Sequence, residues 1–408
     1  MERREFLKLA CAAALGAPLG SALAAPAIAQ GAATVRWWYH FDNPQNSPAE
    51  LVAKFEKENP GIKIQAEAIP WGGGNDYQTR LFAALVAGNA PDCAMVRLSW
   101  AARLQTMKAL EPLDAFLAKW DDRKDIDDNI WKIVGGGSQQ KYYLPLQYVV
   151  IYLYYRQDLL QQAGLKAPET FEDFRAVAKA LTKGDVAGFG MRGGAGGFDN
   201  WGPFVLGGGA SFEKGGMVSE KALAANRAYV DFATKDKVVP ASAATDSFRQ
   251  IVDAFKAGRT GMMIHHVGSA AEIEAALGDK VSAKRVPVGP DGKGWTYFGD
   301  ESNAVFANSK AKEAAFRWIS FLSTGENNSA LTKLTGQLPV SSKANADWVP
   351  KRFVDASRAS VSIAGPLPDS PKTPDFIGRI WPTNMQRALT GQISPDDMMK
   401  AIEQHFYG

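Results

Sequence analysis

Four histidines are the chain's first candidates for metal binding or proton transfer: His40, His265, His266 and His405. His265 and His266 are adjacent in a stretch, residues 260–266, that reads as a β-strand, so their side chains point to opposite faces. Two ligands that point apart cannot easily hold one metal ion. We therefore expect no metal site. One of the pair could still offer a ring nitrogen to a ligand, and the alternative is an ordinary buried histidine.

The remaining short motifs give no sign of a nucleotide site or of an activated nucleophile. Residues 188–193 match the dinucleotide fingerprint by their letters, but that fingerprint needs a helix immediately after it, and here more glycines follow. There is no Gly-x-Ser-x-Gly elbow, and Cys93 lies in an apolar run without a histidine near it in sequence. Acidic pairs occur at Asp121-Asp122 and Asp300-Glu301. Opposed carboxylates could cleave a glycoside, but surface charge explains these pairs equally well.

Large aromatic residues gather where strands are predicted to end. In parallel sheets, ligands bind outside the carboxyl ends of the strands. Flat rings at that edge can cover the C–H faces of a pyranose while neighbouring polar groups take its hydroxyls. Taken singly, each ring is better explained by core packing, but together they favour a carbohydrate-type pocket. The residues concerned are Trp37, Trp38, Tyr39, Trp71, Trp100, Phe198, Trp201, Tyr297, Phe298 and Trp381.

The elements that must position these residues alternate between strand and helix. Residues 34–39 are strand-like, and the capping box Ser47-Pro48-Ala49-Glu50 then opens a helix that Asn59-Pro60-Gly61 stops. Residues 62–68 alternate apolar and polar as a half-buried strand does. A second helix around 77–86 and a strand at 92–98 come next. This order predicts a parallel sheet with helices on its faces.

The pattern restarts in the second part of the chain. Residues 142–155 form a long apolar and aromatic run, interrupted by Pro145, which predicts a strand or a pair of strands passing from one sheet to another. Residues 189–209 are predicted to be a glycine-rich loop around Phe198 and Trp201. No long linker separates the two halves, so we expect the chain to cross between them several times.

The first 29 residues read as an export signal. Arg3-Arg4-Glu5-Phe6-Leu7-Lys8 places paired arginines before an apolar stretch too short to span a membrane, and Ala27-Ile28-Ala29 fits a cleavage site. The twin arginine predicts export of an already folded protein. A lipid anchor at Cys11 is disfavoured because Lys8 stands where a lipobox needs leucine. Only Cys93 survives cleavage, so we expect no intramolecular disulfide and no zinc site built on cysteines.

Charge narrows the range of partners. The formal net charge of the 408 residues is only +3, and the charges are spread along the chain. Nucleic acids and anionic membranes attract proteins through strong or concentrated positive charge. We therefore expect neither as a partner.

A series of short motifs, taken in chain order, resembles one family: the extracellular solute-binding proteins, family 1, which include maltose- and glycerol-3-phosphate-binding types. Each motif alone is weak, but the ordered series covers nearly the whole mature chain. The motifs lie at residues 55–64, 88–92 (Gly-Asn-Ala-Pro-Asp), 110–114 (Leu-Glu-Pro-Leu-Asp), 143–145, 153–160, 254–262, 335–340 and 388–391.

The resemblance implies an α/β fold of the two-lobed, type II periplasmic-binding-protein kind, with a mainly parallel sheet flanked by helices in each lobe and a hinge of several crossovers. The N-lobe would comprise residues 30–146 and 298–336, and the C-lobe residues 147–297 and 337–408. A ligand would be enclosed when the lobes close. The implied protein is a periplasmic monomer without cofactor or catalytic step, and it would deliver a sugar or polyol to the permease subunits of an ABC importer.

The resemblance also suggests which residues contact the ligand. One departure from the family pattern stands at Val267-Gly268-Ser269, where many sugar binders carry a tryptophan. It weakens a maltodextrin assignment and leaves room for a smaller sugar, a polyol or a glycerophosphate-type ligand. One alternative is an exported hydrolase of glycosidic or ester bonds. Another is a polyamine binder, which would need several acidic residues at the ligand, whereas the first loop has just one, Asp42. The expected contacts are Tyr39, His40, Trp71, Ser99, Trp100 and Phe298 in the N-lobe and Phe198, Trp201, His266, Ser269 and Trp381 in the C-lobe.

Overall fold

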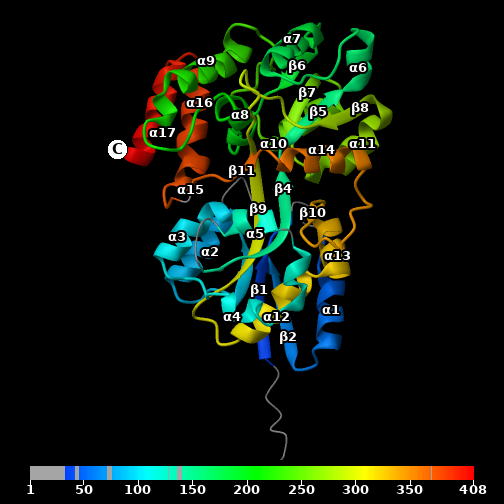
Figure 1. Cartoon of the computed structure of the whole chain (residues 1–408), viewed down its shortest axis with the longest axis vertical. Coiled ribbons are helices and arrows are strands. Elements are labelled where there is room, and N and C mark those ends of the chain that lie inside the picture. Colours follow the sequence, from blue (N-terminus) through cyan, green and yellow to red (C-terminus); the bar gives the residue numbers. More distant parts are fainter. Residues whose placement is uncertain (1–32, 42–45, 71–75, 127, 136–139, 369) are drawn as a thin grey trace, which may run out of the picture.

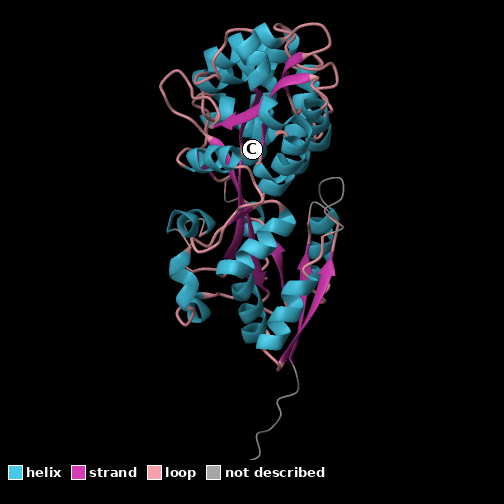
Figure 2. Cartoon of the chain, turned by 90° about the vertical axis from the view of Figure 1, so that its right-hand side faces the viewer, coloured by secondary structure: helices cyan, strands magenta, loops and turns pink. Residues whose placement is uncertain are grey.

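Two lobes lie one above the other along the longest axis of the molecule, each built around its own β-sheet (Figure 1). The computed structural model describes residues 33–41, 46–70, 76–126, 128–135, 140–368 and 370–408. Strands β4 (Leu144–Val150) and β9 (Thr296–Val305) run through the middle, between the lobes. Helices flank the strands of both lobes when the molecule is seen from the side (Figure 2). The two-lobed α/β fold expected from the sequence is confirmed.

The first sheet has the strand order β10-β4-β9-β3-β1-β2, with β11 paired to β9. Strands β1 and β2 pair in parallel, as do β1 and β3, whereas β9 runs antiparallel to both β3 and β4. The predicted strand at residues 62–68 is present with the same limits. The strands not yet bounded are β1 (Ala33–Tyr39), β2 (Ile62–Ala68), β3 (Cys93–Val96), β10 (Leu338–Pro339) and β11 (Ala364–Gly365).

The second sheet has the order β6-β7-β5-β8, built from β6 (Ala187–Gly190), β7 (Thr260–His265), β5 (Tyr152–Arg156) and β8 (Val281–Lys284). Only β6 and β7 are parallel here. Both sheets are therefore mixed instead of mainly parallel. The reason is that the chain enters the upper lobe directly from β4 into β5 and returns directly from β8 to β9, without the helical crossover that a parallel neighbour needs.

The chain passes between the two sheets at residues 150–152, 284–296 and 339–351. The long apolar run predicted to link two sheets is thus β4 followed by β5. The helices are α1 (Ala49–Glu58), α2 (Asp76–Val86), α3 (Ala101–Thr106), α4 (Asp114–Leu117), α5 (Asp128–Val134), α6 (Gln157–Gln162), α7 (Phe171–Leu181), α8 (Phe198–Val205), α9 (Glu220–Thr234), α10 (Phe248–Lys256), α11 (Ala270–Leu277), α12 (Lys312–Leu322), α13 (Gly325–Thr335), α14 (Lys351–Val361), α15 (Thr373–Asp375), α16 (Trp381–Leu389) and α17 (Pro395–Tyr407).

Helix α8 corrects the prediction of a glycine-rich loop over residues 189–209. All its residues are buried, although Pro203 lies inside it. Its glycine serves close packing: a Cβ at Gly202 would lie 2.3 Å from a ring carbon of Trp295. Glycine and proline usually indicate a break in regular structure, and burial of the whole helix overrides that preference here.

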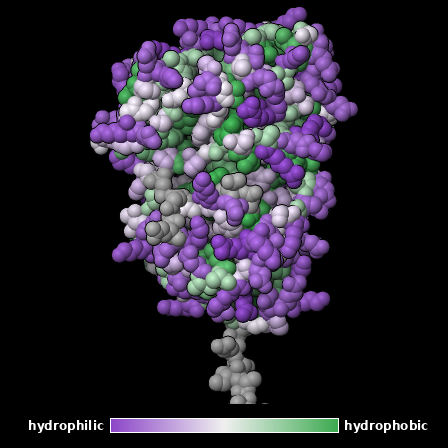
Figure 3. Space-filling view, viewed as in Figure 1, coloured by the Kyte–Doolittle hydropathy of each residue, from purple (hydrophilic) through white to green (hydrophobic). Residues whose placement is uncertain are grey.

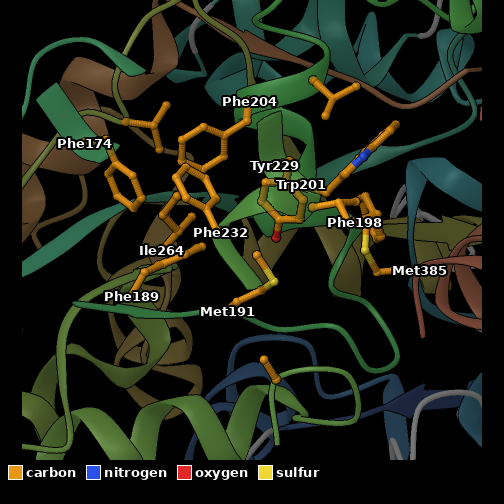
Figure 4. Close-up of a cluster of buried hydrophobic side chains, with 14 of the residues drawn as sticks. Phe174, Phe189, Met191, Phe198, Trp201, Phe204, Tyr229, Phe232, Ile264 and Met385 are labelled. Atoms are coloured by element: carbon orange, nitrogen blue, oxygen red, sulfur yellow. The ribbon is translucent and has the colours of Figure 1, made fainter. Parts of the chain in front are cut away.

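Each lobe has its own hydrophobic core. In the upper lobe, aromatic rings from α7, β6, α8 and α9 pack edge to face, with Phe174 at 5.0 Å from both Phe189 and Phe204 (Figure 4). In the lower lobe, Trp318 packs edge-on against Trp37, with ring centroids 5.3 Å apart. Such pairs stabilise a core beyond the area that they bury.

The face seen in Figure 3 is mainly hydrophilic, with apolar side chains visible between the charged ones. Among the described residues, no helix is long and apolar enough to cross a membrane. In the same part of the chain, no three histidine, cysteine, aspartate or glutamate side chains are grouped as a metal ion would need.

Candidate functional site

A buried carboxylate, Glu301 of β9, is the centre of a polar group on the lower lobe. Arg97 donates from Nη2 to its Oε1 at 2.7 Å, and His40 Nε2 lies 3.5 Å from the same oxygen. Gln147 of β4 donates to the other oxygen. His40 follows β1 and Arg97 follows β3, and the carboxyl ends of parallel strands meet at one edge of a sheet. The fold of this lobe thus gathers the group at the edge that faces the upper lobe.

The charge of Glu301 is stabilised by these neighbours. Its side chain is only 9% exposed, and such burial alone would raise the pKa of a carboxyl. The nearby charges of His40 and Arg97, with the hydrogen bonds from Arg97 and Gln147, outweigh that effect and hold the pKa of Glu301 below its usual value. Glu301 is therefore a carboxylate at neutral pH.

The upper lobe carries a second ion pair, between Arg192 and Asp199. Arg192 Nη1 lies 3.0 Å from Asp199 Oδ2, and Asn200 Nδ2 donates to Asp199 Oδ1 at 3.0 Å. Arg192 lies between β6 and α8, and Asp199 is in the first turn of α8, where a negative charge is favoured. Burial raises the pKa of Asp199 and lowers that of Arg192, while the pair opposes both shifts.

His266 lies where the two polar groups meet. Its ring is close enough to interact with Asp199 and Arg192 of the upper lobe and with Glu301 and Arg97 of the lower lobe. His266 Nδ1 accepts a hydrogen bond from Gly268 N at 3.0 Å, so a neutral ring carries its proton on Nε2. We call Glu301, Arg97, His40, Arg192, Asp199 and His266 the interlobe cluster.

Gln337 lies between the cluster and the third chain segment that passes between the sheets, residues 339–351. Thr335 donates from Oγ1 to Gln147 Oε1 at 2.6 Å, and the backbone N–H of Gln337 donates to Thr335 Oγ1 at 3.4 Å. The side chain of Gln337 lies against Gly268, which shares its loop with His266. Hydrogen bonds therefore run from Glu301 through Gln147 and Thr335 to the backbone of Gln337, whose side chain lies beside the loop that carries His266.

Protonation of His266 is disfavoured in the folded protein. Burial is the main cause, and it lowers the pKa of His266 to about 4, although Asp199 opposes the shift. Because an exposed histidine titrates near pH ~6.5, the stabilising effect of the neutral ring is complete above that pH and is lost as the pH falls towards about 4. We expect the free energy of unfolding to drop by up to about 3 kcal/mol over this window. His266→Gln should remove that part of the drop.

Urea denaturation at about pH 4.5 and about pH 7.5 measures this effect. Other acid-sensitive groups, Glu301 among them, contribute to the drop in both proteins, so the difference between wild type and His266→Gln isolates the ring. An equal drop in the two proteins would contradict the prediction.

Gly268 lies close to the side chains of Gln337 and His266. A Cβ at this position would lie 2.7 Å from Gln337 Nε2 and 2.7 Å from His266 Cε1, closer than real side chains come. We expect Gly268→Ala to lower the free energy of unfolding by about 1–3 kcal/mol, because the side chains of Gln337 and His266 would have to move away from the new methyl group. Thermal unfolding measures it, with Gly61→Ala as the matched control, since a Cβ there meets nothing within 4 Å. Equal melting temperatures for the two variants would refute the prediction.

Among the expected N-lobe contacts that the structure describes, His40 alone belongs to the interlobe cluster. Trp100 is buried and stacks on Tyr77, with ring centroids 6.1 Å apart, and Ser99 is half-buried in the short helical turn before it. Tyr39 stacks on Trp37 in the core. Trp71 lies outside the described residues.

Phe298 occupies the other face of β9. It stacks on Tyr148 of β4, with ring centroids 6.1 Å apart. Phe298 and Glu301 are three residues apart in a regular strand, so their side chains point to opposite faces. The structure therefore does not bring Phe298 together with the interlobe cluster.

Of the expected C-lobe contacts, His266 lies in the interlobe cluster. Ser269 lies next to His265 instead, with its Oγ 3.2 Å from His265 Nε2. The three aromatic residues pack in the core of the lobe. Trp381 is fully buried, and its ring meets that of Trp201 edge-on at 6.3 Å. Phe198 meets Tyr297 edge-on at 5.1 Å, and its place beside Trp201 is visible in Figure 4. Contact of these rings with a ligand stays a prediction.

The charged members of the cluster were missed from the sequence. Glu301 was noted only as half of an acidic pair that surface charge could explain. Arg97 lies at the carboxyl end of the strand predicted over residues 92–98, which was a usable signal, because polar side chains at that position face a ligand edge. Arg192 and Asp199 fall in the stretch predicted as a loop, and no sequence pattern pairs them.

Comparison with known proteins agrees with the fold. The family described as bacterial extracellular solute-binding protein matches residues 20–328. Binding proteins of Brucella abortus and Brucella suis are 27% identical over 370 residues, which is 86% of this chain and 86% of theirs. The chain belongs to this family. It is a solute-binding protein of the ABC-importer class, and its family role is binding without catalysis.

Solved structures of the same class share the fold. An ABC substrate-binding protein of Listeria monocytogenes, in complex with cycloalternan, superposes with a TM-score of 0.77 at 20% identity, covering 92% of this chain and 98% of that one. A solute-binding protein of Agrobacterium radiobacter, in complex with ribitol, gives a TM-score of 0.76 at 20% identity with the same coverage.

Proposed function

We propose that this protein binds a sugar or a related polyol at the interlobe cluster and delivers it to the permease subunits of an ABC importer. The observation that carries the proposal is that side chains able to bind hydroxyl groups converge from both lobes: Glu301, Arg97 and His40 from below, Asp199, Arg192 and His266 from above. A few well-placed polar groups in a largely apolar setting are typical of small-molecule sites.

The mechanism we propose is closure of the lobes on the ligand. A ligand that touches both lobes stabilises the closed arrangement by the difference between its affinities for the closed and open states. The three chain segments between the sheets would act as the hinge. We assign residues 30–146 and 298–336 to one lobe and residues 147–297 and 337–408 to the other. The relatives that bind cycloalternan and ribitol support a carbohydrate-type ligand.

A thermal-shift screen of mono- and disaccharides, polyols and polyamines tests the proposal. A ligand at about 100 times its Kd should add roughly 2.7 kcal/mol of stability. We expect a hit among the sugars or polyols whose thermal shift is smaller in Asp199→Asn than in the wild type. The matched control is Asp375→Asn, because Asp375 pairs with Arg379 on the surface. A hit only among polyamines, or none at all, would overturn the proposal.

Two further parts of the proposal concern the state of the protein in the cell. We expect a periplasmic monomer that has lost residues 1–29. Amino-terminal sequencing and size-exclusion chromatography of the exported protein check both points, and a retained amino terminus or a stable dimer would contradict them.

A further inference from the structure

The charges of the interlobe cluster are balanced within each lobe. The lower lobe holds one guanidinium and one carboxylate, Arg97 and Glu301, whose N–O distance is 2.7 Å. The upper lobe holds the same combination in Arg192 and Asp199, at 3.0 Å. The two histidines add charge only when they are protonated. For His266 this requires acid, since burial lowers its pKa to about 4. With both histidines neutral, the formal charge of the cluster is zero.

In and beside the cluster, both a buried donor and a buried acceptor remain without a hydrogen-bond partner among the described residues. Arg192 Nε is a buried donor and Gln337 Oε1 a buried acceptor, and neither has a hydrogen-bond partner among the described residues. Buried polar groups are normally satisfied, so both await a partner. A hydroxyl group both donates and accepts, whereas a carboxylate or phosphate oxygen at neutral pH mostly accepts, and an ammonium only donates.

Resident carboxylates would also oppose an anionic ligand. Both oxygens of Glu301 already accept hydrogen bonds from Arg97 and Gln147. Asp199 accepts from Arg192 and Asn200. An added anion would meet guanidinium groups that are already neutralised, beside two buried negative charges. In a setting of low dielectric, that repulsion is strong.

We infer that the site is specific for an uncharged polyhydroxylated ligand, and that Asp199 and Glu301 set this specificity by neutralising Arg192 and Arg97. The inference rests on the proposed function and narrows it. Sugar acids, sugar phosphates and amino sugars are excluded, while the neutral members of the same series are bound.

Matched pairs of ligands test the inference by isothermal titration calorimetry at about pH 8, where histidine is neutral. Each pair has one carbon skeleton and differs in charge: ribitol with ribonate, glucose with glucuronate, glycerol with glycerol 3-phosphate, and glucitol with its 1-amino derivative glucamine. We expect heat only from the neutral member of a pair. Equal or tighter binding of a charged member would overturn the inference but leave the proposed function standing. No binding by any member of any pair would instead count against both.

Charge variants provide a second test. Asp199→Asn and Glu301→Gln each leave one guanidinium without its carboxylate, so either should shift the acid-to-neutral affinity ratio at least about tenfold towards the acid. Arg192→Gln should shift the ratio in the opposite direction, and Asp375→Asn should not change it. The variants lie in both lobes, so one that fails to fold does not remove the test. Unchanged ratios in the folded variants would overturn the inference.

Discussion

Glu301→Ala is expected to lower the free energy of unfolding by about 3–5 kcal/mol and to abolish ligand binding. The substitution leaves Arg97 and Gln147 without their buried acceptor. An unsatisfied buried amide at Gln147, together with the loss of the ion pair to Arg97, is costly at the junction of the lobes. Urea denaturation measures the loss of stability, and calorimetry with a ligand found in the screen measures the loss of binding.

The control is Glu313→Ala on the surface of α12. Glu313 pairs with Arg317 at 3.3 Å, but its side chain is 76% exposed. Exposed pairs of this kind contribute little, so we expect a change within about 0.5 kcal/mol and unchanged binding. Similar losses in the two variants would show that burial of Glu301 does not have the effect assigned to it.

Trp381→Ala is expected to lower the free energy of unfolding by about 3–5 kcal/mol, because it opens a cavity in the upper core. Trp381 is 0% exposed and packs against Trp201. The ring also lies so close to Gly197 that a Cβ added there would be 2.9 Å from one of its carbons. The sequence alone suggested this ring as a ligand platform, so the two roles need separate measurements.

Trp381→Phe separates them. It keeps most of the buried ring volume, and we expect it to cost less stability than the alanine variant. The half-buried Trp120, which meets Phe316 edge-on, supplies the control Trp120→Ala with a smaller loss. If the alanine variant at position 381 were as stable as wild type and lost only ligand affinity, the core role would be wrong.

The elements that could be predicted from the sequence are those with a regular spacing of apolar residues or with clear residues that begin or end them. The strand Ile62–Ala68 alternates apolar and polar residues, and the structure gives it the same limits. The run from β4 to β5 was recognisable because apolar residues there exceed the length of one strand. Helix α8 was missed because its glycines and proline oppose helix formation locally, while packing against Trp295 and the core favours it globally.

The candidate site was only partly predictable, for a different reason. His40 follows a recognisable strand, so its place at the sheet edge could be inferred. The partnership of Arg97 with Glu301 joins residues 204 positions apart, and a single sequence holds no signal for such a pair. Aromatic rings were expected at the ligand because they are large and flat. The same properties make them good core residues, and in Trp201 and Trp381 the core use is what the structure shows.

The order of strands in the first sheet has a consequence for how the protein is made. Strand β9, which a ribosome delivers only after residue 296, lies between β3 and β4 and pairs with both. Until it emerges, the nascent chain carries two unprotected strand edges that could pair with other chains. Neither lobe is contiguous in sequence, so neither can complete its fold as an early translation product. The protein must therefore be finished before it is folded, and an export machinery that accepts only folded cargo would receive it after synthesis has ended.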